Sequence, residues 1–263
     1  MTPNPLEPVL FEVKRTIVGQ DVLLERMAIA MLAGGHLLVE GVPGLAKTLA
    51  VKSLAGAIGG QFQRIQFTPD LVPADLVGTR VYHQQSGEFE VSLGPVFTNL
   101  LLADEINRAP AKVQSALLEV MQERQVTIGR DTYPVPEPFL VMATQNPIES
   151  DGTYPLPEAQ VDRFMMKVLV GYPTSPEEHA IVERALGPAG PPQVMLMPQD
   201  LIRMRSSVEK VYVDPAIVDY AVRLVTATRS PAGVGQGDLE RYLPYGASPR
   251  ATIAQVLGGR ALA

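Results

Sequence analysis

Apolar and polar positions change their period along the chain. Five short segments are rich in apolar residues, have the length of strands and are separated by stretches with helical spacing. These segments cover residues 36–39, 62–67, 99–103, 139–143 and 164–170. The helical spacing is clearest after Pro110, which suits the first position of a helix. Because strands and helices alternate, the pattern predicts an α/β domain with a parallel sheet over residues 1–171.

Two segments instead alternate apolar with polar side chains around a central turn. They lie at 80–93 and 123–135, and each predicts an inserted β-hairpin. From residue 172 only helical patterns follow, which predicts a smaller all-α domain over 172–263 in which 230–246 is a glycine-rich loop. Since about a dozen residues follow Arg250, we expect this domain to be incomplete.

The segment 36–49 joins a predicted strand to a predicted helix through a glycine-bearing turn. Successive backbone N–H groups of such a loop, together with the helix dipole, bind phosphate. The general pattern ends in Gly-Lys-Ser/Thr, so Lys47 is expected to contact the β- and γ-phosphates and Thr48 to bind Mg²⁺. The predicted cofactor-binding residues are Gly41, Val42, Pro43, Gly44, Leu45, Ala46, Lys47, Thr48 and Leu49. Ala46 replaces the usual glycine, so we expect negative φ there. An ordinary turn before an amphipathic helix is the alternative.

Two acids follow the apolar run Leu100–Ala103. At the carboxyl end of a buried parallel strand they would lie beside the phosphate loop. Asp104 is therefore expected to hold Mg²⁺, directly or through water, and Glu105 to orient or deprotonate the attacking water. The alternative is that both acids only cap the next helix.

Composition narrows the function further. The 263 residues are 46% apolar with a net charge of −6, which is typical of a globular protein without general affinity for nucleic acid. Cysteine is absent, so disulfides and thiolate chemistry are excluded. The three histidines have no acid or cysteine at ligand spacing, so we expect no transition-metal site. No leader is evident, and no apolar run reaches the roughly 18 residues of a membrane span, so a cytoplasmic location is expected.

Several motifs together resemble the MoxR family of AAA+ ATPases, over nearly the whole chain. They are Gly-Val-Pro-Gly-Leu-Ala-Lys-Thr (41–48), Ala-Asp-Glu-Ile-Asn-Arg-Ala-Pro (103–110), Ala-Thr-Gln-Asn-Pro (143–147), Leu-Pro-Glu-Ala-Gln-Val-Asp-Arg-Phe (156–164) and Gly-Ala-Ser-Pro-Arg-Ala (246–251). The resemblance implies a P-loop ATPase core with an all-α lid. It also implies a homo-oligomeric, hexameric ring that remodels protein clients, often with a partner carrying a von Willebrand factor A domain. The two hairpins would project toward the ring pore.

The resemblance also implies roles for single residues. Asn146 would be the first sensor at the γ-phosphate, Arg250 the second sensor, and Arg163 a finger acting in the adjacent subunit. A surface ion pair between Asp162 and Arg163 is the alternative for the finger, and a surface arginine is the alternative for Arg250. Val18, Gly19 and Gln20 resemble the segment against adenine, although a helix-breaking turn explains them equally well.

Three functions remain open at this stage. The first is ATP-driven remodelling of proteins, and the second is a nucleotide-gated binding module with little turnover. The third, a nucleic-acid motor, requires basic hairpins, whereas 80–93 carries Arg80 against two glutamates. Glu105 with Asn146 favours hydrolysis.

Overall fold

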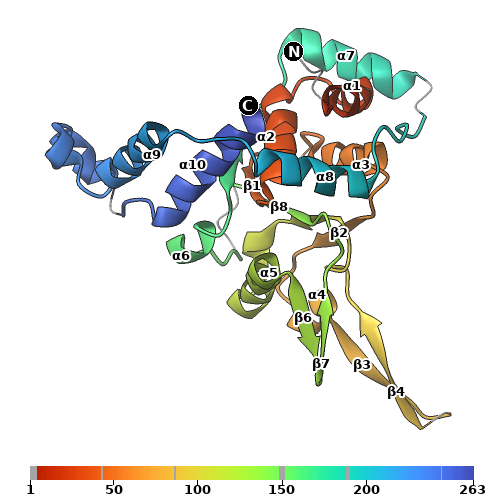
Figure 1. The fold of residues 1–263 in the computed structure, drawn as a ribbon. Helices are drawn as coiled ribbons and strands as arrows, with labels where there is room; N and C mark the ends of the chain where they lie inside the picture. The colour runs from red at the N-terminus through yellow and green to blue at the C-terminus, as the bar shows by residue number, and fades with distance from the viewer. Residues whose placement is uncertain (1–4, 43, 86, 148–151, 188–189, 244) are drawn as a thin grey trace.

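A five-stranded parallel sheet forms the centre of the computed structural model, which describes residues 5–42, 44–85, 87–147, 152–187, 190–243 and 245–263. The strand order is β2-β5-β8-β1-β9, and every pairing is parallel (Figure 1). The strands are β1 (Leu37–Glu40), β2 (Phe62–Gln66), β5 (Leu100–Asp104), β8 (Leu140–Gln145) and β9 (Met166–Leu169). The predicted parallel α/β fold is confirmed, although β9 is shorter than the predicted strand at 164–170.

Strand residues alternate between two apolar layers, as the two-residue period of a strand requires. Leu37 and Leu100 belong to the layer under α1 (Glu7–Thr16), α2 (Asp21–Ala33), α3 (Lys47–Ala57) and α8 (Pro198–Val208). Leu38 and Leu101 belong to the layer under α4 (Pro73–Val77) and α5 (Ala111–Glu123). The central strands are therefore covered on both sides, whereas β2 lies at the edge and carries polar residues.

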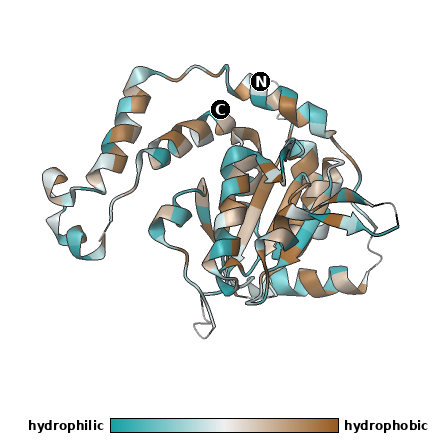
Figure 2. Ribbon diagram, turned by 90° about the horizontal axis from the view of Figure 1, so that it is seen from below, coloured by the Kyte–Doolittle hydropathy of each residue, from teal (hydrophilic) through white to brown (hydrophobic). Residues whose placement is uncertain are grey.

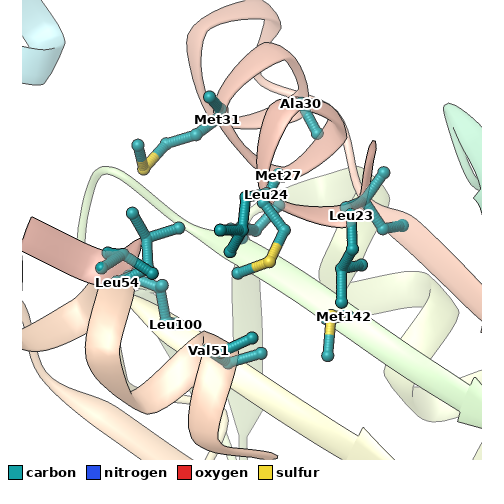
Figure 3. Packing of buried hydrophobic residues seen from close by; sticks show 14 of the residues in the cluster. Leu23, Leu24, Met27, Ala30, Met31, Val51, Leu54, Leu100 and Met142 are labelled. Carbon is teal, nitrogen blue, oxygen red and sulfur yellow. The ribbon is translucent and has the colours of Figure 1, made fainter. Parts of the chain in front are cut away.

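The first layer joins α2 and α3 to the sheet. Figure 3 shows side chains of α2 meeting those of α3, β5 and β8. The labelled residues are Leu23, Leu24, Met27, Ala30, Met31, Val51, Leu54, Leu100 and Met142. Each large apolar side chain buried in this way contributes about 1.5–3 kcal/mol. This packing fixes the start of α3, and hence the loop that precedes it, on the sheet.

Both predicted hairpins are present. β3 (Gly78–His83) pairs with β4 (Glu88–Leu93), and β6 (Gln125–Ile128) pairs with β7 (Asp131–Pro134), both antiparallel. In Figure 1 the β3–β4 hairpin extends away from the central sheet. Tyr82 and Phe89 are register partners on it, with ring centroids 5.1 Å apart, and both are exposed.

The described residues after β9 form helices and no strand. In addition to α8 they are α7 (Ser175–Leu186), α9 (Pro215–Ala227) and α10 (Pro249–Leu262), and α6 (Glu158–Val161) precedes β9. The expected loop at 230–246 is wrong in part, because local i→i+3 turns form the 3₁₀ helices η2 (Pro231–Val234) and η3 (Gly237–Tyr242). Figure 2 shows apolar residues on these outer helices as well as around the sheet. Among the residues described, no helix has the length and apolarity to cross a bilayer.

His36 is a buried structural residue immediately before β1. Its Nδ1 accepts the Val141 N–H at 3.0 Å, and its Nε2 lies 3.1 Å from the Met121 carbonyl oxygen, so Nε2 carries the proton. Burial lowers the pKa of His36 to about 3. Among the residues that the structure describes, there is no group of three His, Cys, Asp or Glu side chains that could hold a metal ion.

Acid is expected to destabilise the fold through His36. The folded state keeps this imidazole neutral, whereas the unfolded chain binds a proton below about pH 6.5, so its contribution is fully present above that pH and falls as pH decreases toward 3. The loss of unfolding free energy approaches about 1.4 kcal/mol per pH unit.

His36→Phe should lower the free energy of unfolding at pH 7.5, because two buried backbone groups lose their partners, but should remove this slope of unfolding free energy with pH. Urea unfolding between pH 7.5 and 5 measures both, with the exposed His179→Gln as control. An unchanged slope in His36→Phe would contradict the assignment.

Candidate nucleotide-binding site

The phosphate loop runs from the end of β1 to the start of α3. A Cβ atom at Gly41 would lie 2.6 Å from the Val170 carbonyl oxygen, so only glycine fits there. Ala46 has φ +56° and ψ 17° and is the N-cap of α3. The expectation of negative φ at Ala46 is wrong: the chain turns from the loop into the helix at this residue, in the conformation that glycine adopts without cost. Alanine costs about 1–2 kcal/mol there. Pro43 lies outside the described residues.

Lys47 lies inside the curve of the loop. Its Nζ donates to the carbonyl oxygens of Gly41 at 2.6 Å and Val42 at 3.1 Å. Burial lowers the pKa of Lys47, and the charges of Asp104 and Glu105 oppose this shift. The ammonium group is therefore within electrostatic range of both acids.

Asp104 ends β5 and uses both of its carboxylate oxygens. Oδ1 accepts from the Thr144 hydroxyl at 2.5 Å. Oδ2 accepts from Arg64 Nη2 at 2.7 Å and Nε at 3.1 Å. Arg64 comes from the edge strand β2 and Thr144 from β8, so three strands meet at this carboxylate. No local sequence pattern points to either partner.

Glu105 directly follows Asp104 but faces other partners. Its φ of +57° lies in the left-handed region, and its N–H donates to Thr144 Oγ1 at 2.9 Å. The carboxylate accepts from Gln66 Nε2 at 2.7 Å and pairs with Arg108 Nε at 3.0 Å. Arg108 lies in the 3₁₀ helix η1 (Ile106–Arg108). The positive φ turns the backbone at Glu105, so that neighbouring acids have separate partners.

The phosphate loop, the two acids and three of their partners, Arg64, Gln66 and Thr144, line one cavity of about 420 Å³. Its lining combines the loop, the acids and the end of β8. The residues are Gly41, Gly44, Leu45, Ala46, Lys47, Thr48, Leu49, Arg64, Gln66, Asp104, Glu105, Thr144, Gln145 and Asn146. Asn146 is buried directly after β8, at the edge of the sheet where the acids lie. A hydroxyl and a carboxylate beside a cationic loop form a donor set that fits Mg²⁺ bound to phosphate.

A second cavity of about 690 Å³ adjoins the first. Four residues line both: Gly44, Leu45, Ala46 and Leu49. Val18 and Gln20 line the second cavity, and Gly19 between them approaches Glu177, whose Oε1 would lie 2.7 Å from an added Cβ. Glu12, Arg15 and Arg184, which the sequence analysis did not single out, also line it. The size of this cavity and its apolar side chains, such as Ile17 and Ile181, suit a nucleoside.

Arg163 and Arg250 lie outside both cavities. Arg163 Nε donates to Gln122 Oε1 at 2.6 Å, and Nη1 donates to the Ala159 carbonyl oxygen at 3.3 Å. The alternative of an Asp162–Arg163 pair is wrong, because Asp162 accepts from the Ser248 hydroxyl at 2.6 Å and lies 3.8 Å from Arg250 Nη1. Arg250 therefore contacts the residue next to Arg163 rather than the phosphate loop of its own chain.

The parallel sheet, the loop between β1 and α3, and the acids at the end of β5 define a P-loop nucleotide-binding fold. A model of the ATPase family associated with various cellular activities (AAA) matches residues 36–166. Chaperone MoxR1 of Mycobacterium tuberculosis is 58% identical over 99% of this chain and 69% of its own length. YeaC of Bacillus subtilis, described as uncharacterized, is 43% identical over 95% of this chain and 76% of its own.

A solved structure is similar as well. The crystal structure of a protein described as a candidate ATPase from Cytophaga hutchinsonii superposes with a TM-score of 0.91 at 50% identity, over 98% of this chain and 79% of that one. The chain belongs to the MoxR family of AAA+ ATPases.

Proposed function

We propose that the protein binds Mg·ATP across the two adjoining cavities and hydrolyses it. The observation that carries this proposal is the convergence of Lys47, Thr48, Asp104, Glu105 and Asn146 on one cavity. The nucleoside would lie beside Val18, Gly19 and Gln20, and the phosphates beside the loop residues 41–49. Membership of an ATPase family supports the same chemistry.

Each side chain has a defined task in this proposal. Lys47 and the N–H groups at the start of α3 bind the β- and γ-phosphates. Thr48 and Asp104 would hold Mg²⁺, which neutralises phosphate charge when bound. Glu105 accepts a proton from the attacking water, and Asn146 orients that water by hydrogen bonding. Arg163 would act at a neighbouring subunit, which is supported by its absence from the lining of both cavities of its own chain. Arg250 remains the proposed second sensor, which would reach from residues 172–263 to the phosphates.

The larger function follows from the family. We propose a cytoplasmic chaperone-like ATPase in which residues 1–171 form the core and 172–263 the lid of a hexameric ring. The name of Chaperone MoxR1 supports action on protein clients, and a von Willebrand factor A domain protein is the proposed partner. The exposed Tyr82 and Phe89 on the β3–β4 hairpin offer apolar contacts to a client. Glu88 and Glu90 on the same hairpin disfavour nucleic acid.

Lys47→Ala is expected to weaken ATP binding roughly 100-fold or more, since a charge-assisted bond to phosphate is lost from a partly buried site. Isothermal titration with Mg·ATP measures the affinity. Lys52→Ala is the matched control, because Lys52 is an exposed lysine on the same helix. Equal affinity in wild type and Lys47→Ala would refute the assignment of the phosphate site.

A steady-state ATPase assay with and without single-stranded DNA separates the three functions that the sequence left open. ATP hydrolysis at the same rate with and without DNA supports ATP-driven remodelling of proteins. Tight ATP binding with negligible turnover supports a nucleotide-gated module, and stimulation by DNA supports a nucleic-acid motor.

A further inference from the structure

Arg64 lines the 420 Å³ cavity and contacts Asp104, the carboxylate to which our proposed function assigns Mg²⁺. It projects from the edge strand β2, where Arg64 and Gln66 are two residues apart and so share one face. Its guanidinium places both Nε and Nη2 on Asp104 Oδ2, and Nη2 also donates to Gln66 Oε1 at 2.7 Å. Three hydrogen bonds therefore hold this cation at the site.

The other oxygen of Asp104 is committed to the protein interior. Oδ1 accepts from the Thr144 hydroxyl, and Thr144 is 1% exposed. The same hydroxyl oxygen accepts the Glu105 N–H, so Thr144 cannot turn away without leaving a partly buried donor unpaired. Because Oδ1 already accepts this buried hydrogen bond, we take Oδ2 as the oxygen through which Asp104 would meet a metal ion, directly or through a water molecule.

Arg64 and a metal ion therefore require the same oxygen. A guanidinium group is permanently charged and cannot relieve the conflict by losing a proton. Two cations at one carboxylate oxygen repel each other, and the effect is largest where water is partly excluded. The side chain of Arg64 is 46% exposed on an edge strand, so water can solvate its guanidinium once it leaves Asp104, whereas the side chain of Asp104 is only 16% exposed.

We propose that Arg64 competes with Mg²⁺ for Asp104 Oδ2, so that the metal binds only by displacing the guanidinium. Arg64 is then a positioning residue that sets the Mg²⁺ concentration at which the site is loaded. The inference rests on the proposed function, because it takes Asp104 as the metal-binding acid.

Removing the charge of Arg64 tests the competition. Arg64→Gln keeps a side chain that can hydrogen-bond but has no charge, and should lower the Mg²⁺ midpoint about two- to fivefold, the range for a partly exposed charge interaction. Arg64→Lys keeps the charge and should stay near wild type. The midpoint is read from the fluorescence of a bound ATP analogue, titrated with Mg²⁺ at fixed analogue concentration, so turnover is not required.

Arg108→Gln is the matched control, because it removes the same charge from the neighbouring acid Glu105. An equal fall in both variants would show a general charge effect and overturn the competition. An unchanged or raised midpoint in Arg64→Gln would also overturn it. If wild type failed to bind the analogue at any Mg²⁺ concentration, the proposed function would fail as well, whereas normal binding with equal midpoints would refute the competition alone.

Discussion

Arg163→Ala is expected to abolish ATP hydrolysis and to leave ATP affinity and the stability of the single chain nearly unchanged. Among the described residues, the side chain hydrogen-bonds to Gln122 and to the Ala159 carbonyl group, neither of which lines the 420 Å³ cavity, so its loss should cost little in folding. A guanidinium that stabilises charge on the transferring phosphoryl group in an adjacent subunit is worth roughly 10³–10⁵ in rate. Steady-state ATPase rates and calorimetric ATP affinity measure the two effects.

Mixing two inactive variants distinguishes action within a chain from action between chains. Lys47→Ala subunits retain Arg163, and Arg163→Ala subunits retain an intact phosphate loop, so a mixed ring should recover activity. Arg203→Ala, which removes a highly exposed arginine from α8, is the control for unspecific charge loss. No recovery in mixtures whose measured mass shows mixed oligomers would count decisively against a finger that acts in trans.

Glu105→Gln is expected to bind Mg·ATP about as wild type does and to hydrolyse it at least ~10²-fold more slowly, which is the usual loss for a missing general base. The amide keeps the shape of the side chain and can still accept from Gln66 Nε2. Because the charge is gone, it no longer takes a proton from water. Single-turnover hydrolysis, with binding measured separately, tests the two halves of this expectation.

Asp104→Asn serves as the comparison for Glu105→Gln. It should weaken Mg²⁺ binding, because the carboxylate that faces Arg64 is replaced by a neutral amide. Normal turnover in Glu105→Gln together with lost turnover in Asp104→Asn would show that the roles of the two acids were assigned wrongly.

Most features that could be predicted from the sequence consist of residues that are close together in the chain. The phosphate loop is recognisable because strand, turn and helix follow one another within 36–49. The acids were placed at its side because the carboxyl ends of parallel strands share one edge of the sheet. Both hairpins were predicted because alternation with a central turn is a local pattern. Asn146 was predicted from the resemblance of residues 143–147 to a family motif, and in the structure it lines the same cavity as Asp104 and Glu105.

Contacts between distant residues could not be predicted in this way. Arg64 is 40 residues from Asp104, and a single arginine in an edge strand has the pattern of an ordinary exposed residue. Only the register of β2 against β5, which pairs Gln66 with Asp104, brings it to the acid. The alternative of a pair between the neighbours Asp162 and Arg163 is wrong, because the start of α10 brings Ser248 to Asp162 from 86 residues away.

The sequence by itself therefore determined the class of fold, the phosphate loop and the two acids, because each depends on the order of neighbouring residues. The tertiary structure alone decided the left-handed conformation of Ala46 and the contact between the Arg64 guanidinium and Asp104. It also decided that Arg163 and Arg250 lie outside the 420 Å³ cavity. These features depend on how separate strands and helices pack against one another, and that packing brings together charges and backbone groups that no local pattern records.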